Sequence, residues 1–128
     1  MFMRFVTTNT DVDSHQPEGV FQLVYTLLEA GNLNKEEYAE LRSLYDWFVK
    51  YLPSPKHPYV KGRATFWYKN SSQECITRMW KLANILRSHN YAIELQTCRW
   101  LGNIIYQDEY QVAAYPSKSS DRIITKTI

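Results

Sequence analysis

Glycine is scarce in this chain, and its shortage excludes several kinds of nucleotide site. The 128 residues include four glycines, and these form neither a GxGxxG nor a GxxxxGK[ST] pattern. The glycines are Gly19, Gly31, Gly62 and Gly102. The sequence therefore lacks the backbone loops that cradle phosphate groups in the common nucleotide-binding folds.

Cysteine and histidine are also sparse. Cys75 and Cys98 are too few for a disulfide framework, and neither lies in a CxxC pair. Cys75 falls on the apolar stripe of a predicted helix, and His89 stands roughly 21 Å farther along that helix, too far to act as its base. The three histidines are scattered without metal-ligand spacing. We expect two buried thiols, no metal site and no cofactor.

The chain also lacks long apolar runs and an excess of one charge. No window approaches the roughly 18 apolar residues of a membrane span, and the segment from Met1 to Val6 turns polar at Thr7, unlike a secretory signal. The net charge is +2, far from that of a strongly basic nucleic-acid-binding domain. We therefore expect a soluble, cytoplasmic protein with no membrane association.

The amino-terminal half predicts one strand and two helices. Residues Met3–Thr8 are β-branched and aromatic, which favours a strand. Apolar residues at helical spacing follow Pro17, and Gly31 supplies the stop. A second helix starts at Asn34, which forms a capping-box pair with Glu37, and it ends before Pro53. The short connection between them predicts an antiparallel helical hairpin.

The carboxyl-terminal half predicts a strand, a helix and further strands. The helix starts at a capping-box pair, Ser71 and Glu74, and ends at Asn90. The segment Arg122–Ile128 has β-branched character and forms either a final strand or a loose tail. The other predicted strands are Arg63–Lys69, Tyr91–Thr97, Asn103–Tyr106 and Tyr110–Tyr115, the last two joined as a hairpin.

This order of elements predicts an α+β fold. We expect a mixed sheet of about five strands, with the helical hairpin and one crossover helix packed on one face. The other face is left for solvent or a partner. Residues 1–116 form this single domain, and residues 117–128 form a carboxyl-terminal tail that is either flexible or an edge strand.

Aromatic residues are abundant, at 15% of the chain, and they are densest in the strand from Arg63 to Lys69. Strand alternation places Arg63, Trp67 and Lys69 on one face. If that face is exposed, a flat ring stacks on Trp67 while the two cations meet phosphates or carboxylates. The alternative is that other elements of the same domain cover Trp67. Arg99 and Trp100 offer a second pair of this kind.

The segment from Lys61 to Tyr68 resembles part of the RNA-binding strand pattern of the RNA-recognition-motif family. The matching positions are Lys61, Gly62, Ala64 and Tyr68. Arg63 and Thr65 stand where that family has stacking aromatics, and the predicted helical hairpin departs from its order of elements. We therefore do not assign the chain to this family.

These observations favour a small, non-enzymatic binding protein that acts on a macromolecular partner, either another protein or a second copy of the chain. Its expected partner-binding residues are Arg63, Trp67, Lys69, Arg99 and Trp100. The alternative is a nucleotide- or RNA-binding module that uses Arg63, Trp67 and Lys69.

A third hypothesis is a small hydrolase or transferase that uses His57 with Asp108 or Glu109. The two acids are adjacent in a predicted turn, so their side chains are expected to diverge, and turns attract aspartate for backbone reasons alone. We therefore name no catalytic residue.

Overall fold

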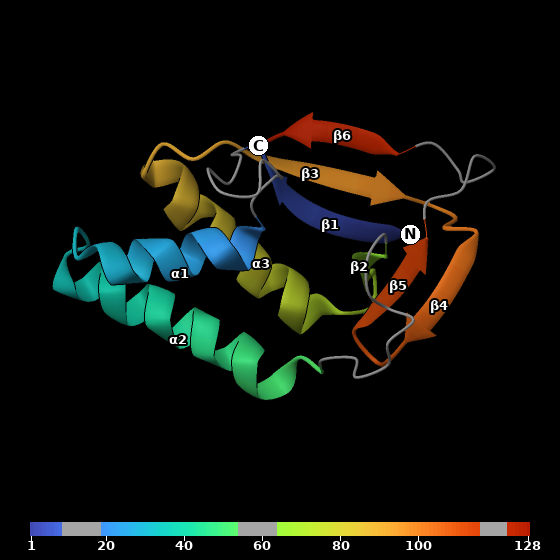
Figure 1. Ribbon diagram of the computed structural model, residues 1–128, viewed down its shortest axis with the longest axis horizontal. Helices are drawn as coiled ribbons and strands as arrows, with labels where there is room; N and C mark the ends of the chain where they lie inside the picture. Colours follow the sequence, from blue (N-terminus) through green and yellow to red (C-terminus); the bar gives the residue numbers. More distant parts are fainter. Residues whose placement is uncertain (9–18, 54–63, 116–122) are drawn as a thin grey trace.

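The computed structural model describes residues 1–8, 19–53, 64–115 and 123–128, and it has three helices and six strands in these ranges (Figure 1). The helices are α1 (Val20–Ala30), α2 (Lys35–Tyr51) and α3 (Gln73–Ser88). The strands are β1 (Phe2–Thr7), β2 (Thr65–Lys69), β3 (Ile93–Cys98), β4 (Asn103–Gln107), β5 (Gln111–Tyr115) and β6 (Ile124–Thr127). The predicted α+β class is confirmed.

The strands form one sheet in the order β4-β5-β2-β1-β3-β6, and every neighbouring pair is antiparallel. The predicted mixed sheet of about five strands is wrong in both respects. Strands β2 and β3 do run in the same direction, but β1 lies between them and pairs with both. The crossover through α3 therefore spans a strand from the start of the chain, and no described strand has a parallel neighbour.

Local signals set most of the helix ends. The Asn34 side chain accepts a hydrogen bond from the Glu37 amide at 2.8 Å, as the capping pattern predicts. Gly31 and Asn90 follow α1 and α3 with φ angles of 74° and 70°, the left-handed geometry that ends a helix. The predicted cap of α3 is wrong, because Ser72 is the N-cap and its hydroxyl donates instead to the Tyr110 carbonyl.

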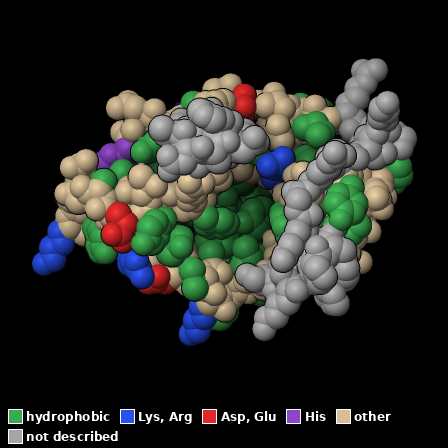
Figure 2. Space-filling model, in the orientation of Figure 1, with side chains coloured by type: hydrophobic (Ala, Val, Ile, Leu, Met, Phe, Trp, Pro, Cys, Tyr) green, Lys and Arg blue, Asp and Glu red, His purple; other side chains and the backbone are tan. Residues whose placement is uncertain are grey.

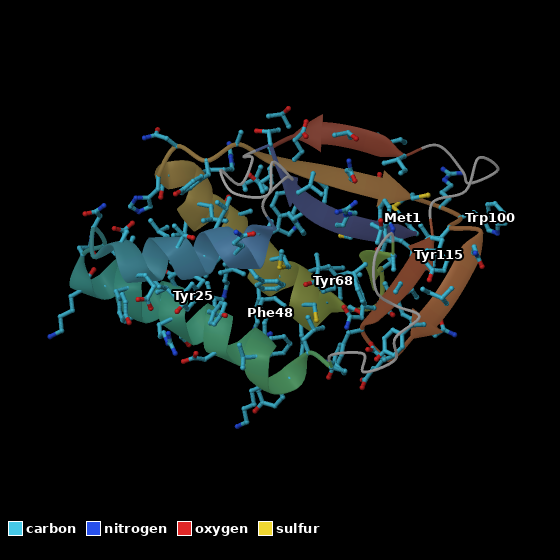
Figure 3. The ribbon with its side chains drawn as sticks, viewed as in Figure 1. Met1, Tyr25, Phe48, Tyr68, Trp100 and Tyr115 are labelled. Carbon is cyan, nitrogen blue, oxygen red and sulfur yellow. The ribbon has the colours of Figure 1, made fainter. Side chains whose placement is uncertain are left out.

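All three helices lie on one side of the sheet. Helices α1 and α3 contact β1 and β3, respectively, and α2 packs against both helices. Side chains from the helices join those of the strands in the main core, where Phe48 of α2 and Tyr68 of β2 belong to the same cluster (Figure 3). Cys75 is fully buried there, as predicted.

The opposite face of the sheet carries a second, smaller core. Trp67 packs there with Val112, its cross-strand partner on β5, and with Cys98 at the end of β3. Leu101, Ala114 and the partly buried Phe2 complete the cluster. The centre of this face is therefore apolar and covered, whereas the sequence suggested that it is left open.

The sheet consists of two halves that a short ladder joins. Strand β1 pairs with β3 along its whole length, but the register of β1 with β2 contains only Phe2 with Lys69 and Met3 with Tyr68. Figure 1 shows β1, β3 and β6 running together, while β5 and β4 cross the view at a steep angle to them. Beyond Met3 the two inner strands diverge.

Candidate functional site

Trp67 is not a surface platform. It is 3% exposed, and its ring lies on the face of the sheet opposite the helices. The guanidinium carbon of Arg4 lies 5.6 Å from the ring centroid. The exposed face that stacking of a base on Trp67 required is therefore absent, and the alternative, that other elements of the same domain cover Trp67, is confirmed. The reason is that β2 is an inner strand, so that side chains from β1 and β5 cover the indole from both sides.

The other predicted site residues do not gather around Trp67 as one surface. Arg63 lies outside the described residues. Lys69 is half-buried in the register position opposite Phe2. Arg99 and Trp100 are exposed just after β3, with Trp100 at 53%, and Trp100 projects at the right-hand edge in Figure 3.

A cavity of about 490 Å³ opens where the β1–β2 ladder stops. Its walls come from β1 and β2, from the start of α1, from the end of α2, and from Met79 and Gln111. Figure 2 shows this side of the molecule hollowed near its centre, with hydrophobic side chains in the hollow and basic atoms at its edge. The cavity contacts residues from both faces of β2, because the diverging strands leave a gap between them.

Arg4 is the one cationic side chain among the described lining residues. It is half-buried, and burial lowers the pKa of its guanidinium, which still stays charged at neutral pH. Its Nη1 donates a long hydrogen bond of 3.4 Å to the Gln96 side-chain oxygen. Among the described residues, no carboxylate lies within 4.0 Å of it. Arg4 is thus a partly desolvated cation without an anionic partner there.

Tyr68 supplies a second polar group to the cavity wall. The side chain is 8% exposed, and its hydroxyl makes no hydrogen bond to a residue that the structure describes. No fully inaccessible side-chain oxygen in the described part lacks a partner, so this hydroxyl must reach open space. Burial, with a smaller contribution from Cys75, raises the pKa of Tyr68, so it is a neutral donor.

The remaining polar wall is fixed in place. The Gln111 amide donates to the Pro53 carbonyl at 2.7 Å, which ties the end of α2 to β5. Gly19, the N-cap of α1, contributes no side-chain cap, and the first turn of α1 has no acidic residue. The amino-terminal end of α1, with its positive partial charge, therefore faces the cavity without a side-chain anion from its own first turn.

Asp108 is a turn residue, as the sequence predicted. Its carboxylate accepts hydrogen bonds from the Tyr106 hydroxyl at 2.6 Å and from the Tyr110 and Gln111 amides at 2.8 and 2.9 Å. Burial raises its pKa, but these hydrogen bonds outweigh burial and hold the pKa of Asp108 below its usual value. The carboxylate is therefore fully occupied in closing the β4–β5 hairpin.

No pairing of nucleophile and base is found among the described residues. Burial raises the pKa of the Cys75 thiol to about 11, which leaves it protonated at neutral pH. His89 contacts Glu37 at 3.1 Å, far from the cavity lining. His57, the base of the third hypothesis, lies outside the described ranges. The described residues also hold no group of three potential metal ligands, and none of their helices is long and apolar enough to cross a membrane.

Comparisons with protein families, with curated proteins and with solved structures find no match to this chain. The residues of the cavity therefore carry the functional argument by themselves. Sequence reasoning missed Arg4 and Tyr68 as residues that line one cavity. The available signal was a charged residue inside an otherwise apolar first strand, Phe2–Val6, which strand alternation alone does not explain.

We predict that Asp108→Ala destabilises the protein by about 1 to 3 kcal/mol at pH 7, because several donors lose a charged acceptor. The folded-state pKa is lowered, so this stability is present above the unfolded pKa and is lost as pH falls through the folded value. Urea unfolding at pH 7 and pH 3 measures the loss of unfolding free energy in Asp108→Ala. The control is Glu109→Ala, a substitution at the exposed neighbouring residue. Equal unfolding midpoints for the two variants at pH 7 would contradict the assignment.

Proposed function

We propose that this chain is a non-enzymatic binding protein that holds a small ligand in the cavity between β1 and β2. A volume of about 490 Å³ falls inside the range of roughly 300 to 1,000 Å³ that is typical of ligand pockets. Such pockets are mainly apolar and contain a few polar groups that orient the ligand. Phe5, Val20 and Met79 supply apolar wall, and Arg4 and Tyr68 supply polar groups.

The single observation that carries this proposal is the early end of the β1–β2 ladder. Continued pairing would set Arg4 opposite Trp67 and Phe5 opposite Phe66, and it would close the gap between the strands. Instead these four side chains line the same cavity. The absence of a paired nucleophile and base among the described residues favours binding over catalysis.

Filling the cavity tests the proposal. Ala64 lines the cavity beside β2, so Ala64→Phe places a ring in the ligand space, whereas Ala39 is exposed on α2 and Ala39→Phe does not. The neutral probe N-phenyl-1-naphthylamine, which fluoresces in apolar surroundings, should bind the wild type saturably. We expect Ala64→Phe to weaken that binding at least tenfold and Ala39→Phe to leave it unchanged.

Thermal unfolding of both variants checks that their folds are intact. Equal affinity of wild type and a folded Ala64→Phe variant would contradict the proposal, as would an absence of saturable binding to the wild type.

A second candidate function, binding of a protein partner, rests on the exposed pair Arg99 and Trp100. Trp and Arg are enriched at the hot spots of protein interfaces. Trp100 is 53% exposed although its backbone is anchored, since its carbonyl accepts a contact from the Cys98 thiol at 3.1 Å. A second copy of the chain is the partner that can be tested directly. With Trp67 buried and Arg63 outside the described ranges, the nucleotide or RNA alternative keeps Lys69 of its own strand, together with the exposed pair Arg99 and Trp100.

If the partner is a second copy, light scattering should show a mass that rises with concentration. Trp100→Ala should shift the dissociation constant at least 30-fold, the effect of a hot spot worth about 2 kcal/mol. Tyr25→Ala, an equally exposed aromatic on α1, should not shift it. A monomeric mass at all concentrations contradicts self-association, and salt-dependent retention on a polyanion column that Arg99→Ala abolishes would favour RNA instead.

A further inference from the structure

We infer that the ligand of this cavity is an amphipathic carboxylate, with its acid group on Arg4 and its apolar part inside the cavity. This inference rests on the proposed function and adds the chemical class of the ligand. It follows from the way in which charge and hydrogen-bond donors are distributed over the cavity wall.

Arg4 is a partly buried cation without a carboxylate partner among the described residues. A guanidinium that is removed from water without an anion is costly, and proteins usually pair such groups. The ion pairs among the described residues are Arg42 with Asp46 and His89 with Glu37, so neither supplies a carboxylate to Arg4. The cation at the cavity wall is therefore available to a ligand that brings its own negative charge.

The contact of Arg4 with Trp67 leaves hydrogen-bond donors of the guanidinium available. The guanidinium carbon lies over the indole, 5.6 Å from the ring centroid, in a cation–π contact. The N–H donors of a guanidinium lie in its plane, and among the described residues only Nη1 has a partner, the long contact to Gln96. A carboxylate matches this planar fork with two parallel hydrogen bonds. The contact with the indole thus leaves N–H donors of Arg4 without a partner among the described residues.

Tyr68 and the start of α1 supply the other polar features of the cavity wall. The Tyr68 side chain is more than nine-tenths buried, and its neutral hydroxyl has no partner among the described residues. It contributes to the cavity wall from the helix side of β2, on the other face of the sheet from Arg4. The uncapped start of α1 adds a positive partial charge on the same cavity. Arg4 and the start of α1 therefore favour an anion over a neutral or cationic group.

The balance of charge selects a monoanion. Arg4 is the one full positive charge on the described lining, so a carboxylate leaves the pair neutral. A phosphate monoester carries up to two negative charges and would leave one of them uncompensated in mainly apolar surroundings. The large apolar wall beside the cation requires an alkyl or aryl body on the acid.

Displacement of N-phenyl-1-naphthylamine by matched ligands tests the inference. Decanoate and decan-1-ol share an apolar chain and differ in the head group. Decyl phosphate has the same chain length and a head group with up to two negative charges. For the wild type we expect decanoate to bind about 10- to 100-fold more tightly than decan-1-ol, the range for charge-assisted bidentate bonds. Decyl phosphate should bind more weakly than decanoate.

Variants assign the preference to residues. Arg4→Gln should reduce the affinity for decanoate to that for decan-1-ol without weakening binding of the alcohol. Arg99→Gln, which removes an exposed cation elsewhere, should leave the affinities for decanoate and decan-1-ol unchanged. If Arg4→Gln fails to fold, Arg4→Lys keeps the charge but loses the planar fork, and it should lose most of the preference.

The outcomes separate the two proposals. Equal binding of decanoate and decan-1-ol to the wild type overturns the carboxylate inference and leaves the ligand-binding proposal in place. A preference for decanoate that survives in folded Arg4→Gln also overturns the inference. Failure of the neutral probe and of all three ligands to bind overturns the proposed function itself.

Discussion

The short ladder between β1 and β2 is the constraint on which the rest of this structure depends. Two backbone pairs, Phe2 with Lys69 and Met3 with Tyr68, join a half-sheet of β6, β3 and β1 to a half-sheet of β2, β5 and β4. Beyond these two pairs, β1 stays paired with β3 and β2 stays paired with β5, but β1 and β2 are no longer paired with each other. The divergence opens a cavity without breaking either half, because every strand stays paired on at least one side.

Arg4 lies where the two halves separate, and it connects features that would otherwise be independent. Its guanidinium contacts Trp67 of the smaller core, and its side chain also lines the cavity that reaches the main core. A cation in this place needs either water or an anion, because among the described residues it has one hydrogen-bond partner, the neutral Gln96 amide, and one aromatic contact, Trp67. The same residue therefore completes the cover over Trp67 and would give the proposed site its preference for an anion.

Local signals in the sequence predicted the elements, and long-range pairing decided their arrangement. Asn34, Gly31 and Asn90 act within a few residues, so their roles as helix ends were readable in advance. Insertion of β1 between β2 and β3 depends on contacts across most of the chain, and no local pattern reports it. That insertion makes β2 an inner strand and buries Trp67, which is why the predicted surface of Arg63, Trp67 and Lys69 failed at its centre. The exposed pair Arg99 and Trp100 lies in a connection, where accessibility depends less on strand order.

Nuclear magnetic resonance of the arginine side chains during titration with decanoate tests the central claim most directly. The Nε–Hε resonance of Arg4 should shift saturably, together with the backbone amides of Thr65 to Tyr68, because both border the gap where the ladder stops. The Nε–Hε resonance of Arg99 should stay in place. Saturable shifts that leave Arg4 unchanged, or that gather around Trp100, would contradict a carboxylate site between the two halves of the sheet.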